Sequence, residues 1–259
     1  MRELSLFTGG GGGVWASKLL GHRIVGYVEW NQYCQKLIAQ RIRDGIFHNA
    51  PIYGDIRAFV SAGYAKRYRG MVDLVSGGFP CQPFSRAGKR LGADDERNMW
   101  PATMECIRII RPRFAFLENV PNLLTYKYFG TILSDLAQSG YDAIWDVFSA
   151  CEFGAPHPRE RLFILAYSNS IRSDRRRQRK GGGTSAEWGM PQVWTQSNAT
   201  GQKPIQTQIW NTTNPDVLRM ADGMANKQHR IRATGNGQVP VVAANAWLTL
   251  FDRIGNNHA

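Results

Sequence analysis

The sequence has few cysteines, and those it has lie far apart. The four cysteines of this 259-residue chain are Cys34, Cys81, Cys106 and Cys151, and no two of them form a Cys-x-x-Cys pair. This spacing argues against a zinc site and against a disulfide framework. We therefore expect no metal, and a reducing compartment in which a cysteine thiolate can serve as a nucleophile.

Long hydrophobic runs are also missing. No apolar run reaches the length of a membrane span, and the short acidic start, residues 1–3, leads directly into strand-like sequence. We expect neither a membrane segment nor an export signal. Hydrophobic residues make up 43% and charged residues 20%, as is typical of a soluble globular protein. The length allows one large domain, or a large domain and a small one.

Acidic residues are scarce relative to basic ones. The chain has 20 Asp and Glu residues against 32 Lys and Arg residues, which gives a net charge of +12. Residues 165–234 hold 11 Lys/Arg and 4 Asp/Glu, so +7 of this charge falls in that window. A basic excess in one region favours a polyanionic partner, most simply nucleic acid. The alternative is a solubilising surface or a disordered basic loop.

The first thirty residues follow a nucleotide-binding pattern. Residues 3–7 read as a strand, Gly9–Gly13 form a glycine-rich turn, and 14–20 read as a helix. A second strand over 23–29 ends in Glu29, about 20 residues after the glycines, where an acid can bond a ribose hydroxyl. A glycine run alone could be a linker, but a linker does not require an acid at this spacing.

A cysteine between two prolines follows another predicted strand. Residues 71–76 read as a buried strand that ends in a Gly-Gly pair, and Cys81 stands between Pro80 and Pro83. Ligands bind at the carboxyl ends of strands in open α/β sheets, and the prolines stiffen the turn. We interpret Cys81 as a candidate nucleophile. The alternative is a buried structural cysteine.

Two further acids occupy predicted strand ends. Asp55 follows a short extended segment, where it can also be the N-cap of a helix that begins at Ile56. Glu118 follows the buried strand 114–117, and partial desolvation there would raise its pKa and let it donate a proton. The alternative for Glu118 is an exposed turn acid.

Two arginines precede the last predicted strand. Arg159 and Arg161 alternate, so at strand spacing both point to one face, although they could also be a solvated charge pair. The other elements that we expect are helices over 31–43, 100–111, 128–139 and 239–254, and strands over 141–150 and 162–167.

The character of the sequence changes from Ser168 onward. Residues 172–180 are strongly basic, and 184–214 are rich in Thr, Gln and Asn, with three tryptophans. Interleaved aromatic and basic residues fit contact with nucleic acid. We therefore predict a small separate domain or an extended loop region here.

The order of these features resembles the ordered motifs of the DNA cytosine-5 methyltransferases. The motifs are Phe7 with the glycine turn, Glu29-Trp30, Gly54-Asp55-Ile56, Pro80-Cys81-Gln82, Glu118-Asn119-Val120, Arg159-x-Arg161 and Gly235-Asn236. The resemblance covers nearly the whole chain apart from about 168–214. It implies an α/β, Rossmann-like, S-adenosylmethionine-dependent methyltransferase fold with a small target-recognition insertion. The implied parts are a catalytic domain over 1–167, a basic recognition region over 168–232, and a C-terminal segment over 233–259 that returns to the catalytic domain.

The resemblance also implies roles for particular residues. The cofactor-binding set is Phe7, Thr8, Gly9, Gly10, Gly11, Gly12, Glu29, Trp30, Asp55, Ile56, Gly78, Pro80 and Asn236. Cys81 would add to C6 of a flipped-out cytosine, and Glu118 would bond N3 and the exocyclic amine. Arg159 and Arg161 would orient the base, and Gln82, Ser85 and Lys89 would contact DNA. The chain departs from the family pattern by its extra glycines, a departure that bears on the rigidity of the turn and on cofactor affinity.

The implied activity is methyl transfer from S-adenosylmethionine to C5 of cytosine in a specific duplex DNA site. The expected partner is double-stranded DNA, with no membrane and no metal, and the enzyme is expected to be a monomer. A cognate restriction endonuclease is left open. The expected place is the cytoplasm of a prokaryote, or of the host of a virus, in association with DNA. Two alternatives stay open, namely the same chemistry on tRNA and a catalytically silent DNA- or nucleotide-binding protein with a decayed methyltransferase fold.

Overall fold

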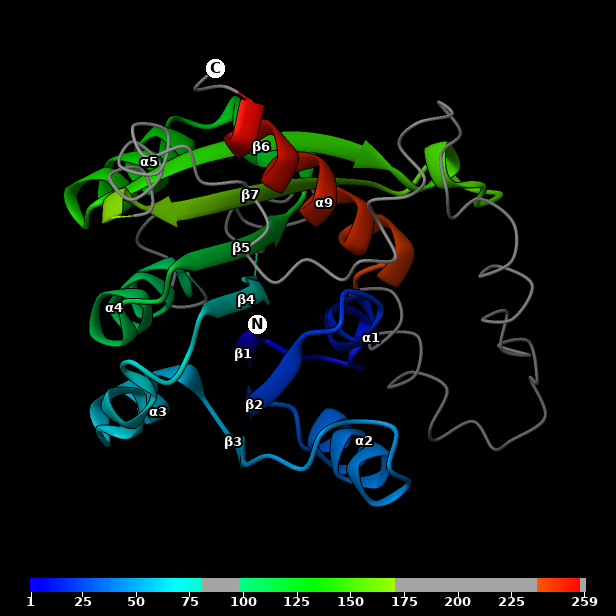
Figure 1. Ribbon diagram of the computed structural model, residues 1–259, viewed down its shortest axis with the longest axis vertical. Helices are drawn as coiled ribbons and strands as arrows, with labels where there is room; N and C mark the ends of the chain where they lie inside the picture. Colours follow the sequence, from blue (N-terminus) through cyan, green and yellow to red (C-terminus); the bar gives the residue numbers. More distant parts are fainter. Residues whose placement is uncertain (81–97, 171–236, 257–259) are drawn as a thin grey trace, which may run out of the picture.

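Seven strands form one sheet at the centre of the molecule. The computed structural model describes residues 1–80, 98–170 and 237–256. The strand order is β3-β2-β1-β4-β5-β7-β6, and β7 is antiparallel to both of its neighbours while the other pairs are parallel (Figure 1). The strands are β1 (Arg2–Leu6), β2 (Arg23–Val28), β3 (Ile52–Tyr53), β4 (Leu74–Gly78), β5 (Phe114–Asn119), β6 (Tyr141–Ser149) and β7 (Glu160–Ser168).

The strand order reverses between β1 and β4. From β1 the chain proceeds outward through β2 and β3, and it then returns to the other side of β1 to begin β4. Ligands of open α/β sheets bind at such a switch point, outside the carboxyl ends of the strands. The predicted cofactor turn follows β1, and β4 ends beside it, so the topology brings the ends of these two strands to this point.

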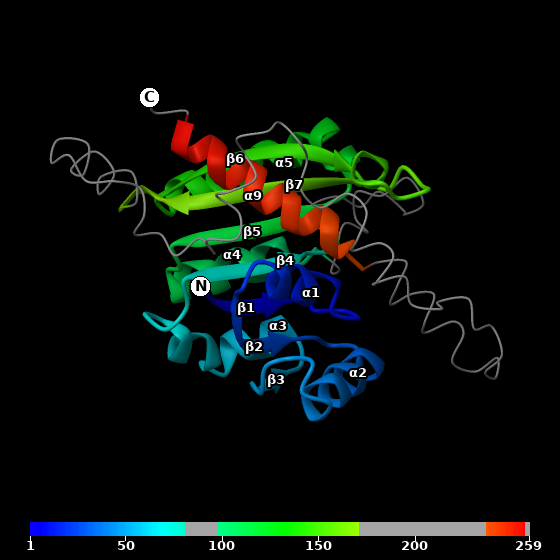
Figure 2. The same ribbon diagram turned by 45° about the vertical axis from the view of Figure 1, so that its right-hand side comes forward.

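Helices cover both faces of the sheet. One face carries α1 (Gly12–Leu19), α2 (Gln32–Arg43) and α9 (Pro240–Asn256), and the other carries α3 (Ile56–Ser61), α4 (Trp100–Ile110) and α5 (Lys127–Gln138) (Figures 1 and 2). Short 3-10 turns are η1 (Tyr64–Tyr68), η4 (Pro121–Thr125) and η5 (Ala150–Phe153). This is the Rossmann-like arrangement expected from the sequence.

The inner strands are apolar because both of their faces are covered. Every residue of β5 is buried, as is expected of a strand with helices on both sides. The last helix, α9, packs against α1, β6 and β7. Its Trp247 stacks on Phe251 at 5.6 Å and meets the ring of Phe116 edge-on at 5.4 Å, measured between ring centroids. The C-terminal segment therefore shares a core with α1 and the strands β4, β5 and β7.

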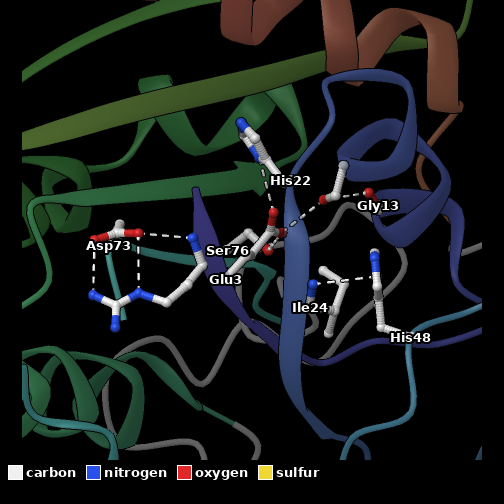
Figure 3. A network of polar contacts seen from close by, with 9 residues as sticks. Glu3, Gly13, His22, Ile24, His48, Asp73 and Ser76 are labelled. Carbon is white, nitrogen blue, oxygen red and sulfur yellow. Dashed lines mark hydrogen bonds and ion pairs between the residues drawn. The ribbon is translucent and has the colours of Figure 1, made fainter. Parts of the chain in front are cut away.

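One carboxylate is buried inside the sheet. Glu3 of β1 is 1% exposed, and its Oε1 accepts hydrogen bonds from the Ser17 hydroxyl at 2.8 Å and from the Ser76 hydroxyl (Figure 3). Its Oε2 lies 3.0 Å from Nδ1 of His22. A buried carboxylate is tolerated when its oxygens are paired in this way. The network joins β1 to α1 and β4, which flank the switch point.

Most predicted elements are present, with shifted ends. One strand was placed too early, because β4 begins at Leu74, and Met71 is an exposed turn residue rather than a buried strand residue. Asn31 caps α2, since its side chain accepts from the backbone N–H groups of Tyr33 and Cys34. Helix and strand ends commonly differ by one or two residues from such expectations.

Candidate cofactor and active site

The glycine turn after β1 takes a backbone conformation that few residues adopt. Phe7, Gly9 and Gly11 all have positive φ angles, of 49°, 56° and 87°. For phenylalanine this left-handed conformation is strained, and such strain is concentrated at functional sites. The turn is held at its start by the Thr8 N–H, which donates to the carbonyl of Val28 on the neighbouring strand β2.

Glu29 at the end of β2 is held from two sides. Its Oε2 accepts the Gly9 N–H at 2.6 Å, and its Oε1 accepts the Asn31 N–H at 2.7 Å. The side chain is nearly buried, so its direction is fixed, while each oxygen keeps a lone pair for a ligand hydroxyl. The next residue, Trp30, is 75% exposed, which leaves a large ring free beside this acid.

A cavity of about 410 Å³ opens at the switch point. Its volume falls within the range of small-molecule and cofactor sites. Of the predicted residues it is lined by Phe7, Thr8, Gly9, Glu29, Trp30, Gly78, Pro80, Glu118 and Arg161. The cavity thus brings the first glycines, the β2 acid and the β5 acid together from four adjacent strands.

Other predicted residues are not in the lining of this cavity. Gly10, Gly11, Gly12 and Arg159 are neighbours of lining residues. Asp55 is the N-cap of α3, where its Oδ1 accepts the Arg57 N–H and its Oδ2 pairs with the Arg57 guanidinium. Ile56 is buried in the core. The contacts of these two residues with adenine therefore stay predictions.

Glu118 is a buried acid and not an exposed turn residue. Burial raises its pKa to about 7, against the opposing effect of Arg161 and Arg159. Nε of Arg161 lies 2.8 Å from Oε1 of the carboxyl group. A carboxyl group with such a pKa is protonated in a large fraction of molecules at neutral pH and can donate that proton. Arg159 and Arg161 are therefore not a solvated pair, since both act on this acid.

Arg159 also connects the last strand to the C-terminal segment. Its Nη2 donates to the carbonyl oxygen of Gly237 at 2.7 Å. The bond places Gly237 and Gln238, which precede α9, at the cavity edge beside the acid. Arg159 thus links β7 to a segment almost 80 residues further along the chain.

The end of β4 runs close to this acid. Gly78 is paired with Glu118 in the sheet, and a Cβ atom at Gly78 would collide with the Glu118 carboxyl group. The Asn119 side chain donates to the carbonyl of Phe79 at 3.2 Å. Glycine is thus required where β4 passes the acid, and Asn119 fixes the chain two residues before Cys81.

Several predicted site residues lie outside the part of the chain that the structure describes. These are Cys81, Gln82, Ser85, Lys89 and Asn236. Pro80, the last described residue before the first gap, and Gly237, the first after the second gap, both line the cavity. The roles of the five residues stay predictions.

Sequence reasoning missed some residues of the site. Asn119 belongs to the Glu118-Asn119-Val120 motif, which does not by itself indicate a role for it, and its side chain donates to the Phe79 carbonyl. Gln238 and Cys34 line the cavity, and burial together with the Glu29 carboxylate raises the pKa of the Cys34 thiol to about 11. Asn119 could have been found from its motif. The other two are brought to the site by packing, which leaves no local signal.

The described residues include neither a metal-binding cluster nor a membrane-spanning helix. Within 1–80, 98–170 and 237–256, no three or more His, Cys, Asp and Glu side chains are grouped so that they could hold a metal ion. In the same ranges no helix has both the length and the apolar character needed to cross a membrane.

Known proteins with similar sequences are bacterial Type II methyltransferases. The chain is 32% identical over 174 residues to M.NgoBI of Neisseria gonorrhoeae, and this match covers 66% of this chain and 51% of that protein. It is 34% identical over 178 residues to M.HpaII of Haemophilus parainfluenzae, with 64% and 46% covered. The chain thus spans about half the length of these relatives.

Solved structures and a family model agree with this likeness. A DNMT2 mutant from Spodoptera frugiperda superposes with a TM-score of 0.54 at 22% identity, covering 66% of this chain and 50% of that one. A putative DNA modification methyltransferase from an E. coli prophage gives 0.51 at 25% identity, covering 66% and 48%. The model of the C-5 cytosine-specific DNA methylase family matches residues 1–244. With the strand order, the cavity and the buried acid in place, this chain belongs to the family of C-5 cytosine-specific DNA methylases.

Proposed function

We propose that the protein transfers a methyl group from S-adenosylmethionine to C5 of a flipped-out cytosine in a specific duplex DNA site. The observation that carries the proposal is Glu118, a buried acid with a pKa near 7 that lies in the same cavity as Glu29. Glu29 is placed to bind a cofactor, and Glu118 is placed to bind a nucleobase. A protein that merely binds nucleotides has no need for the second.

The described residues fit the proposed cofactor. Glu29, oriented by two backbone N–H groups, would accept the ribose hydroxyls, and the exposed ring of Trp30 would stack on adenine. The N-terminus of α1 faces the same cavity through Gly13, and its partial positive charge suits the carboxylate of the methionine part. When bound, S-adenosylmethionine supplies the methyl group on a positively charged sulfur.

The base would be activated by a covalent step. Cys81, as the thiolate, adds to C6 and forms an S–C6 bond. Glu118 gives its proton to N3 at the same time, so the negative charge passes from the thiolate to the Glu118 carboxylate. C5 then carries the electron pair that accepts the methyl group. A base takes the C5 proton, the S–C6 bond breaks, and the N3 proton returns to Glu118, which restores the aromatic ring and releases Cys81 as the thiolate. The target must leave the duplex first, because stacking blocks both faces of the ring.

The arginines have separate tasks in this scheme. Arg161 pairs with Glu118 and would orient the carboxyl group toward N3 and the exocyclic amine. Arg159 bonds the Gly237 carbonyl, so it would keep the C-terminal segment at the cavity edge. The catalytic domain of 1–167 and 233–259, and the recognition region of 168–232, are part of the proposal. The proposal also includes three further points: the protein acts as a monomer on duplex DNA, it is located on DNA in the cytoplasm, and a restriction enzyme accompanies it.

The test is transfer of labelled methyl from S-adenosylmethionine to unmethylated duplex DNA, with Cys81→Ala and Cys151→Ala assayed alongside. Cys151 is an exposed cysteine on η5 and serves as the matched control. We expect label at cytosine C5 with the wild type and with Cys151→Ala, and none with Cys81→Ala. Label on tRNA in place of DNA would overturn the choice of substrate. Bound cofactor without transfer to either would favour a silent binding protein.

A further inference from the structure

The glycine turn raises a physical question about how its shape is kept. Five consecutive glycines, Gly9–Gly13, follow β1, and glycine loses more backbone freedom on ordering than any other residue. A cofactor that had to order the turn itself would bind weakly. Contacts from outside the turn must therefore fix it before the cofactor arrives.

The last turn of α2 supplies such a contact. Nη1 of Arg41 donates to the carbonyl oxygen of Gly10 at 2.5 Å. The guanidinium carbon lies 5.2 Å from the ring centre of Phe47, so the group is held between that ring and the turn. A hydrogen bond from a charged donor is stronger and shorter than one between neutral groups.

Phe47 supports the next glycine of the turn. Gly11 is buried with a φ of 87°, and a Cβ atom there would lie 2.7 Å from Cζ of Phe47 and 3.1 Å from Nη1 of Arg41. Phe47 itself is 4% exposed and meets Trp15 of α1 edge-on at a centroid distance of 5.7 Å. The turn thus lies directly on the aromatic ring, and glycine is needed for that approach.

Arg41 and Phe47 act as one unit. The backbone carbonyl of Arg41 accepts the N–H groups of Ile46 at 2.9 Å and of Phe47 at 3.1 Å, so the end of α2 curls back on itself. Nζ of Lys18 on α1 donates to the Ile46 carbonyl at 2.8 Å. The segment 41–47 is therefore tied to α1 as well as to the turn.

We infer that Arg41, together with Phe47, is a positioning residue that holds the glycine turn in the conformation that binds the cofactor. The inference rests on the proposed function, because it assumes that S-adenosylmethionine binds at this turn. Arg41 does not line the cavity and acts through the Gly10 peptide. Its loss should weaken cofactor binding and leave the chemical step intact.

The same helix offers a matched control. Arg43 is also in the last turn of α2, but it is exposed and its Nη2 donates to Oε1 of Gln40 on its own helix. Arg41→Met removes the donor and the charge, Arg41→Lys keeps the charge and one donor, and Arg43→Met repeats the chemical change away from the turn. Phe47→Leu removes the ring under the guanidinium if Arg41→Met does not fold.

The experiment measures the dissociation constants of S-adenosylmethionine and S-adenosylhomocysteine by calorimetry, and KM and kcat of methyl transfer to duplex DNA. We expect Arg41→Met to raise the dissociation constant and the cofactor KM about tenfold or more, the order of a lost hydrogen bond to a charged group. The kcat at saturating cofactor should stay within about twofold. Arg41→Lys should recover part of the affinity, and Arg43→Met should bind as the wild type does.

The outcomes separate the inference from the proposed function. If the wild type binds neither compound, the proposed function fails. If the wild type binds and Arg41→Met binds equally well, the inference fails while the function stands. An equal loss in Arg43→Met, or a fall in kcat without a rise in KM, would also overturn the inference, because either would show a general effect on the fold.

Discussion

At the scale of single residues, Glu118 has two kinds of neighbour with opposite effects on its proton. The surrounding core disfavours the charged form, whereas Arg161 and Arg159 favour it. Burial has the larger effect and raises the pKa to about 7. An acid with this pKa has the proton to give at neutral pH and is strong enough to give it.

This environment predicts how activity depends on pH. In the proposed mechanism methyl transfer needs the protonated form of Glu118, so the rate of transfer should fall as pH rises through about 7. Glu118→Gln cannot donate the proton, and we expect a loss of about 10²- to 10⁴-fold, the usual contribution of general acid catalysis. The decline near pH 7 should vanish in this variant. Single-turnover rates between pH 6 and 9 test both points.

The control for this prediction is Glu105→Gln. Glu105 lies on α4 with half of its side chain exposed, so the variant makes the same Glu-to-Gln replacement away from the cavity. This variant should keep the rate and pH profile of the wild type. A Glu118→Gln enzyme with an unchanged decline near pH 7 would mean that another group is titrating.

The sequence predicted those site residues whose role depends on their own place in a strand or turn. Glu29 and Glu118 were found because each follows an apolar strand, and strand ends of a parallel sheet share one edge. Arg41 and Gln238 were not, because their roles come from packing. Gln238 reaches Gly12 across more than 220 residues of sequence, and no local pattern encodes such a contact.

At the scale of elements, strands could be predicted where a short run of apolar residues lies next to turn residues. The strands β1, β2 and β5 are short apolar runs next to turn residues, and their ends were predicted to within about two residues. The error at the start of β4 arose because Met71 and Val72 look like strand residues. They belong instead to the turn after η1, where Met71 is exposed and Val72 is buried.

The last helix, α9, completes the core between α1 and the sheet. Trp247 is 3% exposed and packs against Phe114, Phe116, Phe251 and His22. Trp247→Ala should lower the free energy of unfolding by about 3–5 kcal/mol, the usual cost of removing a buried aromatic ring. Urea denaturation followed by circular dichroism measures this change.

A second substitution on α9 tests whether the effect comes from the core. Arg253 is on the same helix with its side chain about half exposed, and its Nη1 pairs with Asp146 at 2.7 Å. Exposed ion pairs contribute little, so Arg253→Ala should cost less than about 1 kcal/mol. Equal losses in the two variants would show that α9 is not held mainly by its aromatic face.

At the scale of the whole molecule, the direction of β7 sets where the proposed recognition region must begin and end. β7 runs antiparallel to β5, so Tyr167 near its end lies opposite Phe114 at the start of β5, on the edge away from the cavity. Gly237 and Gln238 lie at the cavity. The chain between them must therefore pass from one edge of the sheet to the other, about 20 Å for a six-residue strand.

This geometry allows the proposed recognition region to be replaced by a linker that still spans the distance between the two edges of the sheet. We would replace residues 171–232 by a flexible linker of about 20 Gly and Ser residues, whose mean span is about 25 Å. All of the 11 basic and 4 acidic residues counted above lie in this segment. The variant should bind S-adenosylmethionine within about twofold of the wild type, because the described cavity residues are unchanged. It should bind duplex DNA at least about tenfold more weakly.

The salt dependence of DNA binding distinguishes charge from site recognition. Each phosphate contact contributes about −0.9 to the slope of log K against log salt, so the excised variant should have a clearly shallower slope. A control in which the six basic residues of 172–180 become Gln should also have a shallower slope but methylate the same sites. Fluorescence anisotropy at several salt concentrations, with mapping of methylated cytosines, measures both properties. If the excised variant still methylated the wild-type sites, recognition would have to lie in the catalytic domain.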